Sequence, residues 1–369
     1  MNKDSKIAFY GFRGGEGGIS HVMLNLMNAV AATGVQVDLL LHATDIPELD
    51  RVRSDIRVFR LGEGGSFKRA LALSWYLRAE KPFALLVNRE RANRTAVLAR
   101  MLARSPVKLV IRVGMAISKA LERRSLFKRL TRKWGMVYCY RRAEVVIANA
   151  EGVATDIQDI LGLPRERIRV LDNPTVTSDL LEQSREPADH PWLQPGSPPV
   201  VIGVGRLARQ KDFPTLLKAF GILRGERDCR LLILGEGKER SALEQFASDL
   251  GLQQEVAFPG FVANPFKFMS RSALFVLSSA WEGSPNVLIQ ALGLGVPSVA
   301  TDCPGGAKEI LADGKYGPLV PVGDPEALAR AMRSCLDAPH PPEFLRQGAE
   351  RFHADICARA YLNAMGLGR

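Results

Sequence analysis

The chain has 369 residues, which is long for one hydrophobic core and suits two domains of ordinary size. Hydrophobic residues make up 46% and charged residues 24%, so the composition is globular and excludes a disordered or collagen-like chain. The 50 Lys and Arg outnumber the 39 Asp and Glu, and the resulting net charge of +11 predicts a surface that meets an anion. Residues 1–185 carry this excess with 31 basic and 19 acidic side chains, whereas residues 186–369 hold 19 and 20.

The cysteines and apolar runs bear on cellular location. The 5 cysteines are scattered without C-x-x-C or Cys/His ligand spacing, which favours reduced thiols in a cytosol and no metal site. No uncharged apolar run approaches the roughly 18 residues that a membrane span needs, and the short apolar stretch near the N-terminus lacks a signal-peptide cleavage site. We therefore expect a cytoplasmic protein that meets a membrane, if at all, peripherally on the cytosolic face of the inner membrane.

Short β-branched runs alternate with helical segments along the chain, a pattern typical of strand, helix, strand units on a parallel sheet. In the first half, a strand at 6–11 is followed by a glycine loop at 12–18 and then a helix. Further strands are predicted at 35–41, 84–87, 109–113 and 145–149. These elements predict a doubly wound N-terminal domain at residues 1–182.

Proline marks the middle of the chain. Five prolines between residues 182 and 199 exclude a helix or central strand, so we place a linker at 183–199. A second parallel-sheet domain is expected at 200–345, and a helical tail at 346–369 is expected to pack back on the first domain. The strands predicted in the second domain are 200–205, 231–234, 256–258, 274–277, 298–301 and 317–320. The predicted fold class is α/β with two doubly wound domains.

The glycine cluster at 11–18 follows a strand and opens a helix, so backbone amides and the positive helix end could approach a phosphate. The cluster includes Gly17 and Gly18 but fits neither G-x-G-x-x-G nor the G-K-[ST] of a nucleoside triphosphate loop. An ordinary strand-to-helix turn is an equally good interpretation.

Two cations lie in the loop after the strand at 200–205. Arg206 and Lys211 stand at the carboxyl end of that strand, where open parallel sheets place their ligands. Two cations at this spacing suit a diphosphate, Arg as a fork and Lys as a point charge. A solvated loop is the alternative interpretation.

A third segment combines a carboxylate with a helix start. Glu282 ends a strand and loop, and residues 283–287 are predicted as the first helical turn, with free amides that point into a cleft. Gln290 lies eight residues later, about 80° around a helix, so both side chains could face one ligand. A carboxylate and an amide so placed can hold sugar hydroxyls.

Five blocks of sequence occur in a fixed order: G-G-x-x at Gly17 and Gly18, G-R-L-x-x-Q-K at 205–211, L-G-E-G at 234–237, F-x-G-F-V at 258–262, and E-G-x-P-N-V-L at 282–288. With these blocks the chain resembles the retaining glycosyltransferases of family 4 (glycosyl transferases group 1). The resemblance covers essentially the whole chain. It implies the GT-B fold, in which two Rossmann-like domains face each other across a cleft.

The resemblance also implies that the second domain binds a nucleoside-diphosphate sugar. Arg206 and Lys211 match residues that neutralise the donor diphosphate in place of a metal ion, and Glu282 matches a glutamate that contacts the donor sugar. No metal and no cofactor are implied, because the nucleotide sugar is a substrate. The other implied donor-binding residues are Gly17, Gly18, Phe261, Val262, Gly283, Ser284, Asn286, Val287 and Gln290.

Three positions depart from the family pattern. Gln290 stands where a second glutamate usually binds the ribose, so a neutral amide replaces a carboxylate. Ser20 stands where the N-terminal glycine motif often ends in Glu. The segment 112–115 lacks the histidine commonly found in the first domain, so the usual contact of that domain with the sugar has no matching residue here.

The positive charge of the first half is densest between residues 119 and 142, where nine basic residues accompany one acid. Apolar side chains recur there at helical spacing, which predicts a basic amphipathic helix suited to an anionic membrane or a lipid-linked diphosphate. A helix packed on its own domain, with a solvated basic face, is the alternative. Nucleic acid is not expected because no recognition motif accompanies the charge. The side chains assigned to this surface are Arg123, Arg124, Lys128, Arg129, Arg132, Lys133 and Trp134.

The resemblance implies a retaining, metal-independent enzyme of the hexosyltransferase type in polysaccharide or lipopolysaccharide biosynthesis. Its donor would be a UDP-hexose or UDP-N-acetylhexosamine, UDP being the commonest donor nucleotide for this resemblance. Its acceptor would be a lipid-linked or cell-surface glycan. Two alternatives stay open: a GT-B epimerase or phosphorylase, and a donor-binding scaffold subunit without turnover.

Overall fold

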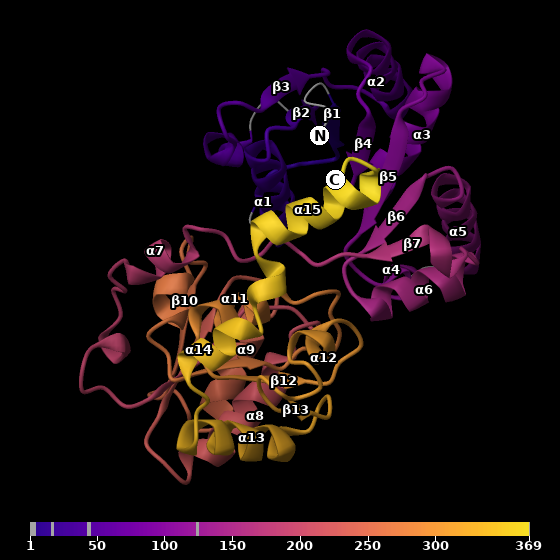
Figure 1. The fold of residues 1–369 in the computed structure, drawn as a ribbon. Coiled ribbons are helices and arrows are strands. Elements are labelled where there is room, and N and C mark those ends of the chain that lie inside the picture. The colour runs from indigo at the N-terminus through magenta and orange to yellow at the C-terminus, as the bar shows by residue number, and fades with distance from the viewer. Residues whose placement is uncertain (1–4, 16–17, 43–45, 123–124, 369) are drawn as a thin grey trace. The chain divides into compact units, whose positions relative to one another are not determined.

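A computed structural model describes residues 5–15, 18–42, 46–122 and 125–368, shown as a ribbon in Figure 1. The chain divides into two compact units. Unit 1 comprises Met1–Thr175 and Phe352–Arg369, and unit 2 comprises Val176–Arg351. Each unit is built on one parallel sheet covered by helices, which confirms the prediction of two doubly wound α/β domains.

Unit 1 contains a seven-stranded sheet of order β3-β2-β1-β4-β5-β6-β7, in which every neighbouring pair is parallel. Its strands are β1 (Lys6–Tyr10), β2 (Gln36–Leu41), β3 (Arg57–Arg60), β4 (Ala84–Val87), β5 (Lys108–Val113), β6 (Val145–Ala148) and β7 (Ile168–Val170). The central strands are buried on both faces, as expected for a parallel sheet covered by crossover helices.

Two helical layers cover the faces of this sheet. The helices are α1 (Gly18–Ala32), α2 (Ser66–Glu80), α3 (Glu90–Ala103), α4 (Ile117–Glu122), α5 (Leu126–Tyr140), α6 (Glu151–Leu161) and α15 (Ala354–Met365). One core contains buried residues of α1 and α15, which lie side by side (Figure 1), and the other contains buried residues of α2, α3, α4, α5 and α6. Successive residues of β1 alternate between the two cores, so the layers lie on opposite faces.

Unit 2 contains a six-stranded parallel sheet of order β10-β9-β8-β11-β12-β13. Its strands are β8 (Val200–Val204), β9 (Arg230–Leu234), β10 (Val256–Gly260), β11 (Leu274–Leu277), β12 (Ser298–Thr301) and β13 (Leu319–Val320). Its helices are α7 (Leu180–Arg185), α8 (Phe213–Arg224), α9 (Arg240–Asp249), α10 (Phe266–Met269), α11 (Asn286–Leu294), α12 (Ala307–Ile310), α13 (Pro325–Asp337) and α14 (Pro342–Gln347). The strand order reverses between β8 and β11, and such reversals are where open sheets bind ligands.

The division between the units differs from the predicted domain boundaries. The chain passes from unit 1 to unit 2 after Thr175, and the proline-rich segment 183–199 lies in unit 2. That segment is held there because the Asn264 Nδ2 donates to the Gln183 carbonyl at 2.8 Å and the Ser270 Oγ donates to the Ser184 carbonyl at 3.1 Å. Of the tail predicted at 346–369, only the part from Phe352 onward belongs to unit 1. No helix in the described ranges is long and apolar enough to span a membrane.

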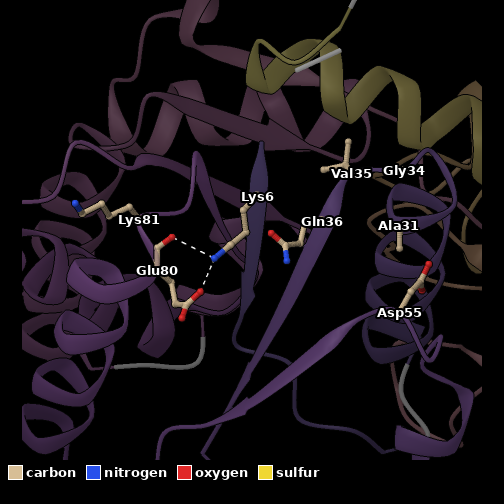
Figure 2. A pocket seen from close by; sticks show the side chains of 8 residues that line it. All are labelled: Lys6, Ala31, Gly34, Val35, Gln36, Asp55, Glu80 and Lys81. Carbon is tan, nitrogen blue, oxygen red and sulfur yellow. Dashed lines mark hydrogen bonds and ion pairs between the residues drawn. The ribbon is translucent and has the colours of Figure 1, made fainter. Parts of the chain in front are cut away.

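A polar cavity of about 620 Å³ opens at the amino ends of β1 and β2 in unit 1 (Figure 2). The Lys6 side chain reaches from β1 to the Glu80 carboxylate and main-chain carbonyl. Behind it, the fully buried Asp38 accepts two hydrogen bonds of 2.8 Å from Arg57 and one of 2.5 Å from the Tyr76 hydroxyl. These charges satisfy one another, and the cavity lies at the opposite edge of the sheet from the carboxyl ends of the strands.

Candidate functional site

The carboxyl ends of β8, β9 and β10 in unit 2 are joined by main-chain hydrogen bonds between their loops. The Gly205 amide donates to the Leu234 carbonyl at 2.9 Å, and the Gly235 amide donates to the Gly260 carbonyl at 2.8 Å. A Cβ atom on Gly235 would lie 2.0 Å from the Gly205 carbonyl oxygen, and its φ of +135° is one that L side chains rarely adopt. Only glycine therefore allows the loops at 205–211 and 234–237 to approach this closely.

A buried ion pair lies beside these loops, where β8 and β11 are neighbours. The Lys211 ammonium, in the loop after β8, lies 2.7 Å from the Glu282 Oε1, in the loop after β11. The Ser279 hydroxyl donates to the same oxygen at 2.7 Å, and the Gln210 Nε2 donates to the Glu282 Oε2 at 3.3 Å. The Glu282 carboxylate therefore accepts from one cation and two neutral donors, which fix its orientation. Both partners of the ion pair are also largely buried.

The backbone around Glu282 is equally constrained. The Glu282 amide donates to the Pro304 carbonyl at 2.9 Å, and the Gly306 amide donates to the Gly283 carbonyl at 2.6 Å. A Cβ atom on Gly305 would lie 2.5 Å from the Glu282 carbonyl oxygen. The loops after β11 and β12 thus pack backbone against backbone, which fixes the position from which the Glu282 side chain extends.

Arg206 differs from Lys211 although both lie in one loop. The Arg206 side chain is exposed, and within the described ranges it has neither a hydrogen bond nor an ion pair. A guanidinium without a carboxylate partner, at the carboxyl edge of a parallel sheet, is available to an anionic ligand. Lys211 could meet the same anion only by sharing or leaving its contact with Glu282.

The helix after Glu282 begins later than predicted. α11 starts at Asn286, with Pro285 in an extended conformation before it, so Gly283 and Ser284 lie in the loop and not in the first helical turn. The prediction of a turn over 283–287 is wrong because Pro285 stands at the N-cap. Glu282 is therefore not on the helix, and its predicted 80° offset from Gln290 does not apply.

The remaining predicted donor residues of unit 2 lie around this edge. Asn286 and Val287 occupy the first turn of α11 and are half-buried. Gln290 occupies the second turn, and its side chain has no hydrogen bond in the described ranges. Phe261 is exposed and Val262 half-buried in the loop after β10, two strands away from β8. The structure places these five side chains at the same sheet edge, and their assignment to a donor stays a prediction.

Cys303 is a buried neighbour of this site that the sequence did not single out. Burial raises the pKa of its thiol to about 11, and the negative charge of Glu282 acts in the same direction, so the thiol is neutral at pH 7. No three His, Cys, Asp or Glu side chains in the described part of the chain are grouped to hold a metal ion. Reaction without a metal or cofactor stays a prediction.

Of the two glycines of unit 1 that were predicted to bind the donor, one lies in the described part of the chain. Gly17 lies outside the described residues, and Gly18 begins α1. The segment without a histidine contains Arg112, which is buried and donates through Nε to the Tyr361 hydroxyl at 3.0 Å and through Nη2 to the Asn173 Oδ1. Arg112 therefore serves to hold α15 and the end of the sheet together.

The basic segment forms two helices and not one. α4 ends at Glu122 and α5 begins at Leu126, and Arg123 and Arg124 lie outside the described residues. The prediction of one helix over 119–142 is wrong in this respect. Lys128 and Arg129 are exposed on α5, Lys133 is half-buried, and Arg132 forms an ion pair with Glu90 of α3.

The packing of α5 agrees with the alternative interpretation in that the helix packs on its own domain, but it leaves part of the predicted apolar face exposed. α5 packs on the domain through Met136, Cys139 and Tyr140, while Phe127 and Trp134 of the predicted apolar face are exposed. Sequence reasoning missed a second exposed apolar row on α2, because a helical period does not reveal which face is buried.

Comparisons with known proteins agree with the two-unit division. A family model described as "Glycosyl transferase 4-like domain" matches residues 17–174, and one described as "Glycosyl transferases group 1" matches residues 198–338. The chain is 34% identical over 197 residues to the lipopolysaccharide core biosynthesis glycosyltransferase LpsE of Rhizobium meliloti, covering 53% of this chain and 55% of that protein.

A second curated relative is the Campylobacter jejuni N-acetylgalactosamine-N,N'-diacetylbacillosaminyl-diphospho-undecaprenol 4-alpha-N-acetylgalactosaminyltransferase. It is 27% identical over 67% of this chain and 65% of its own length. The matched part of the chain thus spans between half and two thirds of these relatives. Among solved structures, Anabaena HepE in complex with UDP and glucose has a TM-score of 0.77 and 22% identity over 98% of this chain and 99% of that one. Neighbours of this kind show the GT-B glycosyltransferase fold.

Proposed function

The chain belongs to the group 1 glycosyltransferases, and we propose that it transfers a sugar, with retention of anomeric configuration, from a nucleoside-diphosphate sugar to a lipid-linked or cell-surface glycan. The observation that carries this proposal is the group of Arg206, Lys211 and Glu282 at the carboxyl edge of the unit 2 sheet. This group provides two cations that suit a diphosphate and one carboxylate that can accept hydrogen bonds from sugar hydroxyls.

The proposed chemistry follows from the charge that develops during bond cleavage. Breaking the bond between the anomeric carbon and the phosphate oxygen leaves negative charge on the distal phosphate, which preorganised cations stabilise. Arg206 is free to contact that phosphate, and Lys211 would reach it from its position beside Glu282. The acceptor hydroxyl would form the new bond from the same face of the sugar and give its proton to a phosphate oxygen. No metal ion is required in this scheme, because Arg206 and Lys211 supply the positive charge.

Ser279 and Gln210, the two neutral donors to Glu282, would allow Lys211 to move from Glu282 to the donor phosphate without releasing the carboxylate. If Lys211 turns toward the donor phosphate, Ser279 and Gln210 still hold one oxygen each of the Glu282 carboxylate. The carboxylate then keeps its orientation and accepts hydrogen bonds from sugar hydroxyls. We therefore assign Glu282 to the donor sugar, and Gly283, Ser284, Asn286, Val287 and Gln290 to its surroundings.

A UDP-sugar is proposed as the donor and a lipid-linked glycan as the acceptor. The Anabaena protein whose fold this chain shares is described in complex with UDP and with UDP-glucose, which supports the nucleotide. The Campylobacter relative is named for transfer to a diphospho-undecaprenol-linked sugar, and the Rhizobium relative for lipopolysaccharide core biosynthesis, which supports the acceptor class. We further propose that the acceptor is met at an anionic membrane surface through the basic helix α5, without a nucleic-acid partner.

The test is incubation of the full chain with UDP- and GDP-sugars and a lipid extract that contains glycan-linked diphosphates. Transfer that persists with a chelator and yields a product of retained configuration, as read by NMR, supports the proposal. An isomerised donor or phosphate-dependent release of the sugar would indicate an epimerase or phosphorylase instead. Donor binding without turnover by either route would indicate a scaffold subunit.

A further inference from the structure

A row of large apolar side chains is exposed along α2 of unit 1. Phe67 is 66% exposed and Trp75 is 64% exposed, and Leu71 lies between them with its side chain also exposed. The three residues follow one another at intervals of four, which advances about 40° around a helix at each step, so they form one row. The opposite side of α2 is buried through Leu73 and Leu77, so the exposed row is additional to the face that packs on the sheet.

α5 carries a similar row. Phe127 is 77% exposed, Trp134 is 72% exposed, and Leu130 and Tyr138 are exposed at intervals of three and four from them. Soluble proteins bury most tryptophan surface, and two tryptophans this exposed in one helical layer indicate a binding surface. Tyr138 is partly covered, since the Arg142 guanidinium lies 3.6 Å from its ring centroid, whereas the large apolar side chains of both rows stay exposed.

The two rows belong to one continuous helical layer. The Tyr138 hydroxyl of α5 lies 3.5 Å from the sulfur of Met101 on α3, and Met101 is itself exposed. α3 packs along α2, and Arg78 near the end of α2 donates through Nε to the Ala103 carbonyl at the end of α3 at 3.5 Å. α2, α3 and α5 also share one core on the same face of the sheet. The rows therefore lie on the two helices that contact α3, and α3 carries Met101.

The charge of α2, α3 and α5, which form this part of the layer, is strongly positive. α2, α3 and α5 contain three, three and four Lys or Arg residues, against one acid each in α2 and α3 and none in α5. Both acids are occupied, because Glu80 pairs with Lys6 and Arg57 and Glu90 pairs with Arg94 and Arg132. The layer on the other face is nearly neutral, since α1 has no Lys, Arg, Asp or Glu and α15 has one of each sign.

We propose that α2, α3 and α5 together form one docking surface for an anionic bilayer, with the aromatic row of each outer helix inserted among the lipid headgroups. This surface, called the aromatic face, consists of Phe67, Leu71, Trp75, Met101, Phe127, Leu130, Trp134 and Tyr138. Exposed Trp and Tyr favour the boundary between headgroups and acyl chains, and surrounding Lys and Arg are attracted to anionic lipid. The inference deepens the proposed function, on which it rests, by extending membrane contact from the basic helix α5 to α2.

Two aromatic rows would constrain the orientation of unit 1 on a bilayer more than one row does. A single amphipathic helix can roll on a surface, whereas two rows on separate helices, α2 and α5, would fix the orientation of unit 1 on the bilayer. α2 follows β3 directly, and α5 leads directly into the amino end of β6, so Phe67 and Phe127, near the starts of these helices, lie toward the carboxyl edge of the sheet. A lipid-linked acceptor entering from the bilayer would therefore arrive along the edge at which parallel sheets bind ligands.

The test is flotation of the purified full chain with vesicles of phosphatidylcholine alone or mixed with phosphatidylglycerol. We expect binding to the anionic vesicles, lowered about tenfold by F67A/W75A on α2 and by F127A/W134A on α5. The matched control is I222A/L250A, which removes two exposed apolar side chains from unit 2 and should leave flotation unchanged. Tryptophan fluorescence should shift to the blue on binding, and W75A should lose part of that shift.

Two results would overturn the proposal. Flotation unchanged by F67A/W75A, with flotation lost in F127A/W134A, would restrict the contact to α5. A fall in molecular mass with F67A/W75A, measured by light scattering without vesicles, would identify the aromatic row as an interface between proteins. Transfer of the sugar to an acceptor in detergent measures the proposed function separately, and F67A/W75A, whose residues lie outside the acceptor helix α5, should retain it.

Discussion

Ser279 and Lys211 approach the same oxygen of Glu282, each at 2.7 Å, although Ser279 belongs to the loop after β11 and Lys211 to the loop after β8. One oxygen thus accepts from a neutral donor fixed in its own loop and from a cation that can turn away. In the proposed mechanism the cation has a second role, at the donor phosphate, whereas the hydroxyl has none. In this scheme Ser279 positions one oxygen of Glu282, and Gln210 the other, whenever Lys211 contacts a ligand.

Replacing Ser279 by alanine should weaken transfer more than donor binding. Loss of one hydrogen bond to a buried carboxylate costs about 1–3 kcal/mol, which corresponds to a fall in kcat of about 5-fold to 150-fold. Steady-state kinetics of S279A should show this fall with a smaller change in KM, and S279T, which keeps the hydroxyl, should recover part of it. S298A is the control, because Ser298 is also a buried serine but starts β12 at the amino edge of the sheet. Equal losses in S279A and S298A would contradict the positioning role.

Arg206 should contribute to turnover without contributing to stability. Its side chain is exposed and has no ion-pair partner in the described ranges, so R206A should leave the melting temperature within about 1 °C of the parent, as surface substitutions usually do. If the guanidinium stabilises the departing phosphate, kcat/KM should fall about 100-fold. R209A removes a second exposed arginine of the same loop and should retain activity. Comparable activity in R206A and R209A would remove Arg206 from the site.

Gly235 offers a test of the backbone contact on which the site is built. An alanine there would place its Cβ 2.0 Å from the Gly205 carbonyl and would also be strained at a φ of +135°, so the loops must separate. We expect G235A to destabilise unit 2 by about 2 kcal/mol or more and to abolish donor binding. G221A is the matched control, because Gly221 lies within α8 with only an ordinary contact, and alanine there should be neutral or stabilising. Thermal denaturation and donor titration distinguish the two variants.

The sequence predicted most of the fold because parallel strands are buried on both faces and read as apolar runs. It missed β3, whose sequence Arg-Val-Phe-Arg lies at an exposed sheet edge and therefore lacks that signal. The residues of the ion pair were predicted individually, since Lys211 and Glu282 lie in loops after strands. Their contact was not predictable, because it depends on β8 and β11 being neighbours across 71 residues of sequence. Ser279 gave no signal at all, since a serine in a loop is common.

The network of Lys6, Glu80, Arg57 and Asp38 at the amino edge of the unit 1 sheet predicts a dependence of stability on pH. Hydrogen bonds from Lys6 and Arg57 hold the pKa of Glu80 below its ordinary value of 4.5. A carboxylate with a lowered folded pKa stabilises the native state above its unfolded pKa, and this contribution is lost as the pH falls through the folded value. Glu80 is partly solvated, so the contribution at pH 7 is expected to be about 1 kcal/mol or less.

E80Q tests this dependence directly. At pH 7 it should lower the free energy of unfolding slightly, because a neutral amide attracts Lys6 and Arg57 less strongly than a carboxylate does. The difference between E80Q and the parent should shrink as the pH falls below 4.5 and the parent carboxylate becomes protonated. Urea denaturation at several pH values measures it, with E63Q as the control at an exposed glutamate that forms no ion pair in the described ranges. A difference that stays constant with pH would mean that Glu80 stabilises unit 1 through packing and not through its charge.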